Sequence, residues 1–152
     1  MTIFLASDHA GFFLKEKIKA HVNLAGYMAV DCGAYTENPT DDYPDFISKA
    51  AEMVSKNPTE DKAIVFGASG QGEDIVANKF PHVRSAVYYG GSLDIVRLSR
   101  EHNDANVLSL GAKFVDEEQA YGAVDLWLTT AFSGEERHVR RIAEIEDIEE
   151  KI

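Results

Sequence analysis

The sequence predicts an α/β protein: a Rossmann-like three-layer α/β/α arrangement with a five-stranded parallel sheet and an extra C-terminal helix. Short, almost wholly apolar runs alternate with longer stretches of helical periodicity. Such runs are typical of strands that are buried on both faces of a parallel sheet. Several of the runs end in polar residues or glycines. In doubly wound folds that edge of the sheet binds ligands.

The alternation of apolar runs and helical stretches predicts five strands and six helices. The expected strands are residues 3–6, 27–32, 62–66, 83–89 and 107–110. The expected helices are residues 13–24, 44–56, 74–80, 92–103, 117–132 and a last one from about residue 135. Gly26 is a stop signal for the first helix, and Pro44 suits the first turn of the second. The last helix carries an apolar stripe but follows five complete units, so packing on its own domain or on a second subunit are both open.

Length and composition narrow the function classes. A chain of 152 residues is expected to form one domain, residues 1–152. Its net charge of −11 argues against nucleic acid and against an anionic membrane as partners. No apolar stretch is long enough to cross a bilayer, and the N-terminus does not resemble a signal peptide, so we expect a cytoplasmic protein. The single cysteine, Cys32, is interpreted as a small buried residue.

A glycine-rich turn from Gly67 to Glu73 follows the third predicted strand. Successive backbone amides before a helix favour an anion, and a carboxylate beside them is suited to moving a proton. The spacing G-x-x-G-x-G differs from the dinucleotide fingerprint, and the Gly-Lys-Ser/Thr of a P-loop is absent. Taken alone, the glycines would equally fit a plain strand-to-helix connection.

Other ionisable residues also have structural interpretations. Asp8 and His9 follow the first strand, but Asp8 would equally cap the next helix. His102 ends a helix, where a histidine favours the dipole. Arg137, Arg140 and Arg141 concentrate positive charge in an acidic protein, although a helix face paired with glutamates explains them on spacing alone. No histidine or cysteine pair has metal-ligand spacing, so we predict no metal.

Five segments, in order along nearly the whole chain, resemble the ribose-5-phosphate isomerase B family, which includes the galactose-6-phosphate isomerase subunits. They are Ser7–Gly11, Asp42–Pro44, Gly67–Glu73 with Ala77–Lys79, Leu98–Asn106 and Arg137–Ile142. The resemblance implies a homodimer, in some members a tetramer, with active sites at the interface and no cofactor. It also implies interconversion of an aldose phosphate and a ketose phosphate through a cis-enediolate.

One departure from the commonest branch of this family concerns the base. That branch has a cysteine at the end of the third strand, where this chain has Gly67. A second branch, familiar from actinobacteria, ends the glycine-rich turn in a glutamate that is thought to be the base. Glu73 matches that glutamate, so the resemblance places the chain in the glutamate branch.

The resemblance also suggests roles for the other residues. In this hypothesis His102 opens the furanose ring, and Asp8 accepts or relays a proton. Ser69 and the amides around Gly70 and Gly72 would hold the enediolate oxygens. The remaining assignments are Asn103 and Tyr43 for sugar hydroxyls, and His9, Arg137 and Arg141 for the phosphate, with the arginines expected from the partner subunit.

The sequence leaves the sugar undetermined. We expect ribose 5-phosphate and ribulose 5-phosphate, with a six-carbon sugar phosphate such as galactose 6-phosphate or allose 6-phosphate as the alternative. A non-catalytic sugar-phosphate-binding or nucleotide-binding module is a further alternative, which the presence of Glu73, His102 and Asp8 disfavours.

Overall fold

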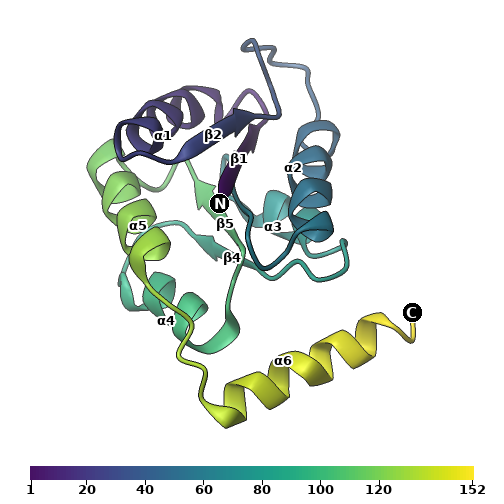
Figure 1. Cartoon of the computed structure of the whole chain (residues 1–152). Helices are drawn as coiled ribbons and strands as arrows, with labels where there is room; N and C mark the ends of the chain where they lie inside the picture. The colour runs from purple at the N-terminus through teal and green to yellow at the C-terminus, as the bar shows by residue number, and fades with distance from the viewer.

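The computed structural model describes residues 1–152 and confirms the predicted three-layer fold. The strands are β1 (Thr2–Ser7), β2 (Met28–Asp31), β3 (Lys62–Gly67), β4 (Ser85–Tyr88) and β5 (Val107–Gly111). The helices are α1 (Phe12–Leu24), α2 (Pro44–Lys56), α3 (Gln71–Ala77), α4 (Asp94–Asn103), α5 (Glu117–Thr129) and α6 (Glu136–Glu149). The strands pair in parallel in the order β2-β1-β3-β5-β4 (Figure 1).

The helices cover the sheet unequally. In Figure 1, α1, α4 and α5 lie on one face of the sheet, and α2 and α3 lie on the other. The first interface is a core cluster that includes Ile18, Leu108 and Trp127, all fully buried. The second is a separate cluster that includes Ile47, Val65 and Ala77. These two cores hold the strands in register, so the residues that follow each strand meet at one edge.

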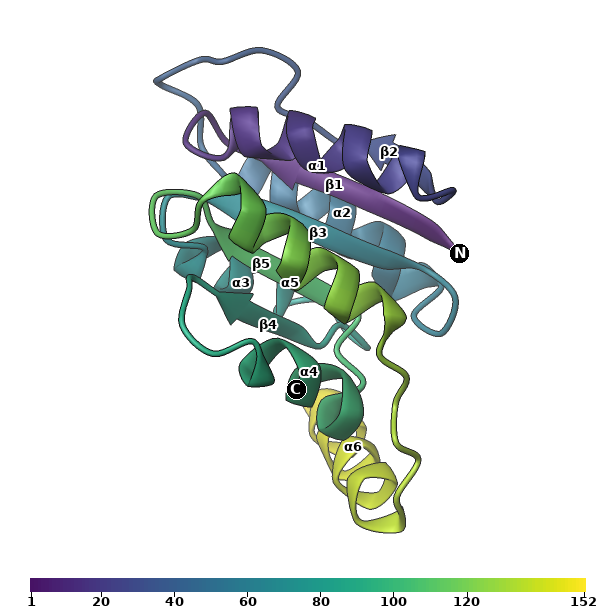
Figure 2. The ribbon, with the colours of Figure 1, turned by 90° about the vertical axis from the view of Figure 1, so that its left-hand side faces the viewer.

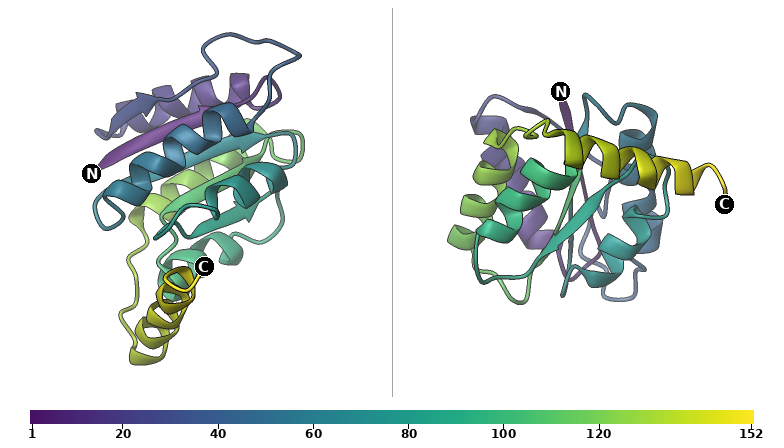
Figure 3. Two further views of the ribbon diagram at one scale, coloured as in Figure 1. Left: turned by 90° about the vertical axis from the view of Figure 1, so that its right-hand side faces the viewer. Right: turned by 90° about the horizontal axis from the view of Figure 1, so that it is seen from below.

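The last helix stands outside this sandwich. Figures 2 and 3 show α6 beyond the β4 side of the sheet, next to α4. The connection to α6 is fixed where the Ser133 amide donates to the Glu101 carbonyl at 3.1 Å. Three of its apolar side chains, Val139, Ile145 and Ile148, are exposed. The predicted apolar stripe therefore has only part of its surface covered within the chain.

Several predicted boundaries were wrong, and three of them have a clear local cause. The helix expected from Asp74 begins at Gln71, because Gly70 adopts a left-handed conformation (φ 78°) that starts the helix inside the glycine-rich turn. The helix expected to reach Phe132 ends at Thr129. There Thr130 is extended, and its hydroxyl donates to the Leu126 carbonyl at 2.6 Å. Strand β4 is shorter than predicted because Val83 is held in a turn by its bond to the Phe80 carbonyl.

No helix of the protein is long and apolar enough to cross a membrane. Location in the cytoplasm stays a prediction.

Candidate active site

The carboxyl ends of β1, β3 and β5 bring the predicted residues of the N-terminal half together. Ser7 lies opposite Phe66, and Phe66 lies opposite Leu110, so the next residues of all three strands share one edge. That edge holds Asp8 and His9 from the β1–α1 corner. It also holds the turn that contains Ser69, Gly70, Gly72 and Glu73. This is the edge at which ligands bind in parallel α/β sheets.

The glycine-rich turn is packed tightly against β5. A Cβ at Gly70 would lie 3.1 Å from the backbone of Leu110 and Gly111, and the Ser109 hydroxyl donates to the Gly70 carbonyl at 2.7 Å. The Ser69 hydroxyl accepts from the Gln71 amide at 3.3 Å. The turn is therefore a rigid support that presents the first amides of α3 and the Ser69 side chain at the edge of the sheet.

Glu73 lies in the first turn of α3 and is buried, with 4% of its surface exposed. Its carboxylate lies directly against Gly67. A Cβ added to Gly67 would stand 1.9 Å from Oε1 and 2.0 Å from Cδ of Glu73. Burial raises the pKa of Glu73, and the negative charge of Asp8 raises it further. The result is a carboxylate that binds a proton more strongly than an exposed glutamate does.

Tyr43, the residue before α2, lies over the same turn. A Cβ at Gly72 would be 2.6 Å from Cζ of Tyr43 and 2.8 Å from its hydroxyl oxygen. The phenol ring can therefore approach α3 only because residue 72 has no side chain. This contact brings the Tyr43 hydroxyl to the helix turn that carries Glu73.

Asp8 and His9, which follow β1, lie at the same carboxyl edge of the sheet. Asp8 is buried, and its Oδ1 accepts from the amides of Ala10 (2.9 Å) and Gly11 (3.3 Å), which both precede the first residue of α1. The N-cap of α1 is Gly11, and no side chain caps the helix, so the capping interpretation of Asp8 is wrong. Nδ1 of His9 lies 2.6 Å from Oδ1 of Asp41. The side chains of Asp8, His9 and Asp41 bring possible ligand atoms within 4.8 Å of one another. The His9–Asp41 hydrogen bond already occupies Nδ1, and the absence of a metal stays a prediction.

The remaining predicted residues lie elsewhere in the chain. His102 and Asn103 end α4, which runs back from the carboxyl edge to the amino edge of the sheet. Arg137 and Arg141 are exposed on α6, beside that end of α4. Strand β5 separates the two edges by four residue steps, or about 13 Å. Within a single chain, the predicted site residues therefore lie in two separate groups.

In the second group, His102 is in contact with α6. The rings of His102 and His138 stack with centroids 4.2 Å apart and an interplanar angle of 16°. Burial lowers the pKa of His138, and the neighbouring His102, Arg137 and Arg141 lower it further, so the neutral ring is favoured. Arg137 pairs with Glu135 at 3.0 Å, whereas Arg141 forms no ion pair. Arg141 is thus a free guanidinium whose charge acts on the neighbouring His138.

Three further residues at these two places were not predicted from the sequence. His138 supports His102, and its spacing of four from Ile142 on the apolar stripe was the available signal. Asp41 precedes the Asp42–Pro44 segment, but nothing in the sequence indicated that it would pair with His9. Lys113 follows β5, and its amide donates to the Ala68 carbonyl at 3.0 Å, which places a lysine beside the glycine-rich turn.

Cys32 is buried, as predicted, and burial raises the pKa of its thiol. A thiol that resists ionisation is a poor nucleophile. Cys32 packs in the core cluster under α2.

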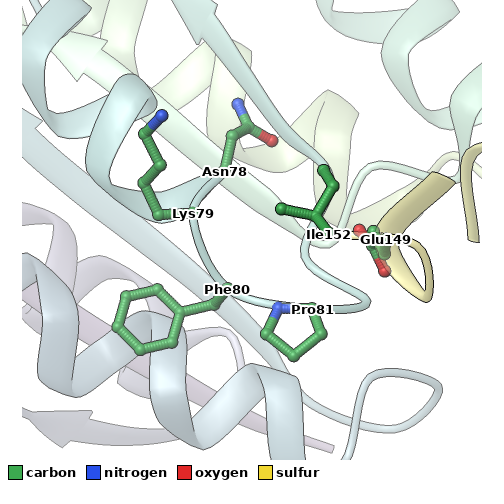
Figure 4. Close-up of a pocket in the computed structure, with 6 residues that line it drawn as sticks. All are labelled: Asn78, Lys79, Phe80, Pro81, Glu149 and Ile152. Carbon is green, nitrogen blue, oxygen red and sulfur yellow. The ribbon is translucent and has the colours of Figure 1, made fainter.

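A cavity of about 400 Å³ lies away from the carboxyl edge, between the segment after α3 and the end of α6. Figure 4 shows Glu149 and Ile152 facing the Asn78–Pro81 segment. A second cavity of about 370 Å³ continues along α6 and is lined by Ile145, Ile148 and Asn103 among others. Incomplete packing around α6 explains both cavities, because the helix stands outside the sandwich.

Residues 3–145 match the model of the ribose/galactose isomerase family, and the chain belongs to that family.

Several individual relatives are named ribose-5-phosphate isomerase B. That of Mycolicibacterium paratuberculosis is 42% identical over 93% of this chain and 87% of its own length. That of Escherichia coli is 36% identical over 98% of this chain and 97% of its own length. The crystal structure of the Mycoplasma genitalium enzyme with bound ribulose 5-phosphate superimposes with a TM-score of 0.95 at 37% identity, covering 99% of this chain and 97% of that one.

Proposed function

We propose that this protein interconverts ribose 5-phosphate and ribulose 5-phosphate, with Glu73 as the base. Glu73 takes the proton from C2 of the open-chain aldose, which leaves a cis-enediolate. It then returns the proton to C1, while a hydroxyl proton moves from O2 to O1. The relatives named ribose-5-phosphate isomerase B, and the ribulose 5-phosphate bound to one of them, support this substrate pair.

The contact between Glu73 and Gly67 carries the proposal. The carboxylate of Glu73 fills the space that a side chain at position 67 would occupy. Position 67 is where the commonest branch of the family has its cysteine base. The glutamate reaches from the first turn of α3 to the same point, so the two branches place different bases against the same substrate carbon. The raised pKa of Glu73 makes its carboxylate a stronger base for a C–H proton.

The edge around Glu73 also supplies groups for the oxyanion. The Gly72 amide, in the first turn of α3, and the Ser69 hydroxyl lie on the rigid turn next to Glu73. Preorganised donors of this kind stabilise a developing enediolate without reorganisation. Tyr43 covers the turn and, in this proposal, binds a sugar hydroxyl. Lys113 follows β5, and its backbone amide donates to the Ala68 carbonyl in the same turn.

We further propose that the complete site forms between two copies of this chain. Residues for ring opening and phosphate binding (His102, Asn103, Arg137 and Arg141) lie at the opposite end of the sheet from Glu73. In a twofold dimer, the carboxyl edge of each subunit can face the amino edge of its partner. The symmetry then produces this contact twice, once for each site. The exposed apolar side chains of α6 and the cavities beside it support a second copy as the missing packing partner.

A coupled assay across sugar phosphates tests the substrate. We expect turnover of ribose 5-phosphate by this chain alone, and a much lower kcat/KM for galactose 6-phosphate and allose 6-phosphate. Preference for a hexose phosphate would reassign the substrate. Binding of ribose 5-phosphate without turnover would favour a non-catalytic module.

Replacing Arg141 with alanine is expected to raise KM for ribose 5-phosphate by about 10-fold or more, because a charge-assisted contact to the phosphate is lost. Arg141 is exposed and unpaired, so its loss leaves no uncompensated partner within the chain. Arg140→Ala is the matched control, since Arg140 lies 3.8 Å from Glu144 on the same helix and has no proposed role. Steady-state kinetics of both variants measure the effect; equal KM values would remove Arg141 from the phosphate site.

A further inference from the structure

Asp41 and His9 form a hydrogen-bonded pair that none of the roles above explains. Oδ1 of Asp41 lies 2.6 Å from Nδ1 of His9 and also accepts from the His9 backbone amide at 3.0 Å. His9 belongs to the β1–α1 corner, whereas Asp41 belongs to the loop between β2 and α2. One carboxylate therefore fixes both the backbone and the ring of His9 from a different part of the chain.

The two side chains differ in exposure. Only 8% of the Asp41 side chain is exposed, against 35% for that of His9. The other oxygen of Asp41, Oδ2, is buried and accepts no hydrogen bond. Leaving a buried carboxylate without a cation costs several kcal/mol. A protonated His9 ring, with Nδ1 at 2.6 Å from Oδ1 of Asp41, would supply that cation.

We propose that Asp41 is a positioning residue that holds His9 as an imidazolium with Nε2–H available to the substrate phosphate. This inference rests on the proposed function together with the assignment of His9 to the phosphate, which the family resemblance suggests. An imidazolium has two donors, so it can donate from Nδ1 to Asp41 and from Nε2 to a phosphate oxygen at the same time. A neutral imidazole that donates to Asp41 through Nδ1 has only a lone pair on Nε2, which repels the phosphate.

The surrounding charges act in the same direction. The hydrogen bond to Asp41 raises the pKa of His9, while partial burial opposes the rise. The charges of Asp8, Asp41 and Glu37 raise it further. Of the three carboxylates only Asp41 is hydrogen-bonded to the imidazole ring, so removing its charge has the largest effect on the ring.

Asp41→Asn tests the proposal, because the asparagine oxygen can still accept from the His9 amide and from Nδ1. At pH 8 we expect KM for ribose 5-phosphate to rise about 10-fold with kcat unchanged. At pH 6 the rise should shrink, since His9 of the variant is then also protonated. Glu37→Gln is the matched control: Glu37 is exposed and makes no hydrogen bond to His9, so KM should change less than about 2-fold.

An NMR titration of the His9 ring measures its pKa without any turnover. The His9 ring signal is assigned because it is missing from the spectrum of His9→Gln. The His9 pKa should fall in Asp41→Asn and stay nearly constant in Glu37→Gln. An unchanged pKa in Asp41→Asn would overturn the proposal, and so would a lowered pKa with unchanged KM at pH 8. A lowered pKa in a protein that turns over no sugar phosphate would support the pair and instead reject the proposed function.

A double-variant cycle distinguishes an effect of Asp41 on His9 from an effect on the folding of the loop. In the His9→Gln background, Asp41→Asn should add no further increase in KM, because the ring through which it acts is gone. A further loss there would show that Asp41 acts on the loop rather than on His9.

Discussion

Glu73→Gln is expected to lower kcat for ribose 5-phosphate by ~10²–10⁴-fold and to leave KM nearly unchanged, because the general base is lost while the phosphate contacts remain. Glutamine has the shape of glutamate, so the packing against Gly67 is kept. Steady-state kinetics and exchange of the C2 proton with solvent measure the effect. Near-normal kcat would remove Glu73 as the base.

The pH dependence adds an independent signature. The pKa of Glu73 is raised above 4.5 by burial, so the wild-type rate should fall on acidification at a higher pH than for an exposed glutamate. This acid limb should be missing from the residual rate of Glu73→Gln. A limb at the same pH in the variant would assign it to another group.

The same pKa shift affects stability. A carboxylate whose folded pKa is raised favours folding only in its protonated form. That contribution is complete below the unfolded pKa and is lost as the pH rises through the folded pKa. At neutral pH the ionised Glu73 therefore costs stability, and Glu73→Gln should have a higher Tm than wild type. The difference should shrink in acid.

Gly67→Ala tests the same contact from the other side. Gly67 does not have a left-handed conformation, so alanine is compatible with its backbone. Its methyl group would, however, occupy the position of the Glu73 carboxylate. We expect a large fall in kcat and a lower Tm in Gly67→Ala. In a Glu73→Ala background the methyl group has space, and Gly67→Ala should then cost little stability.

The parallel sheet could be predicted from sequence because strands buried on both faces are apolar throughout, as Ile64, Val65 and Phe66 are. The contact between Glu73 and Gly67 could not be. It depends on where α3 begins, and that depends on Gly70 taking a left-handed conformation against β5. The His9–Asp41 pair was equally hidden, because it joins residues 32 apart through a loop without periodicity.

The separation of His102 from Glu73 could have been predicted from the topology of a parallel sheet. A helix that follows a parallel strand returns to the amino edge of the sheet, so His102, at the end of α4, lies far from the residues that follow β1 and β3. The family resemblance implies active sites at the dimer interface, with Arg137 and Arg141 from the partner subunit. The position of His102 extends that expectation to ring opening, and a site shared in this way has a direct test.

A heterodimer of Glu73→Gln and His102→Ala subunits is expected to recover roughly half of the wild-type kcat, although each variant alone is nearly inactive. In a twofold dimer with shared sites, one site of the heterodimer carries both substitutions and the other carries neither. Co-expression with two affinity tags isolates the heterodimer, and the ribose 5-phosphate assay measures its rate. If Glu73 and His102 acted within one subunit, neither site would be intact and no activity would return.

The matched control combines two substitutions from the same edge of the sheet. In a heterodimer of Glu73→Gln and Asp8→Asn, each site receives its whole carboxyl edge from one subunit, so each contains one defect. We expect no recovery in that heterodimer. Recovery there as well would indicate that Asp8 and Glu73 serve different sites, which their side-by-side strands β1 and β3 argue against. The contrast between the two heterodimers therefore reports which residues share a site, independently of how strongly each substitution lowers the rate.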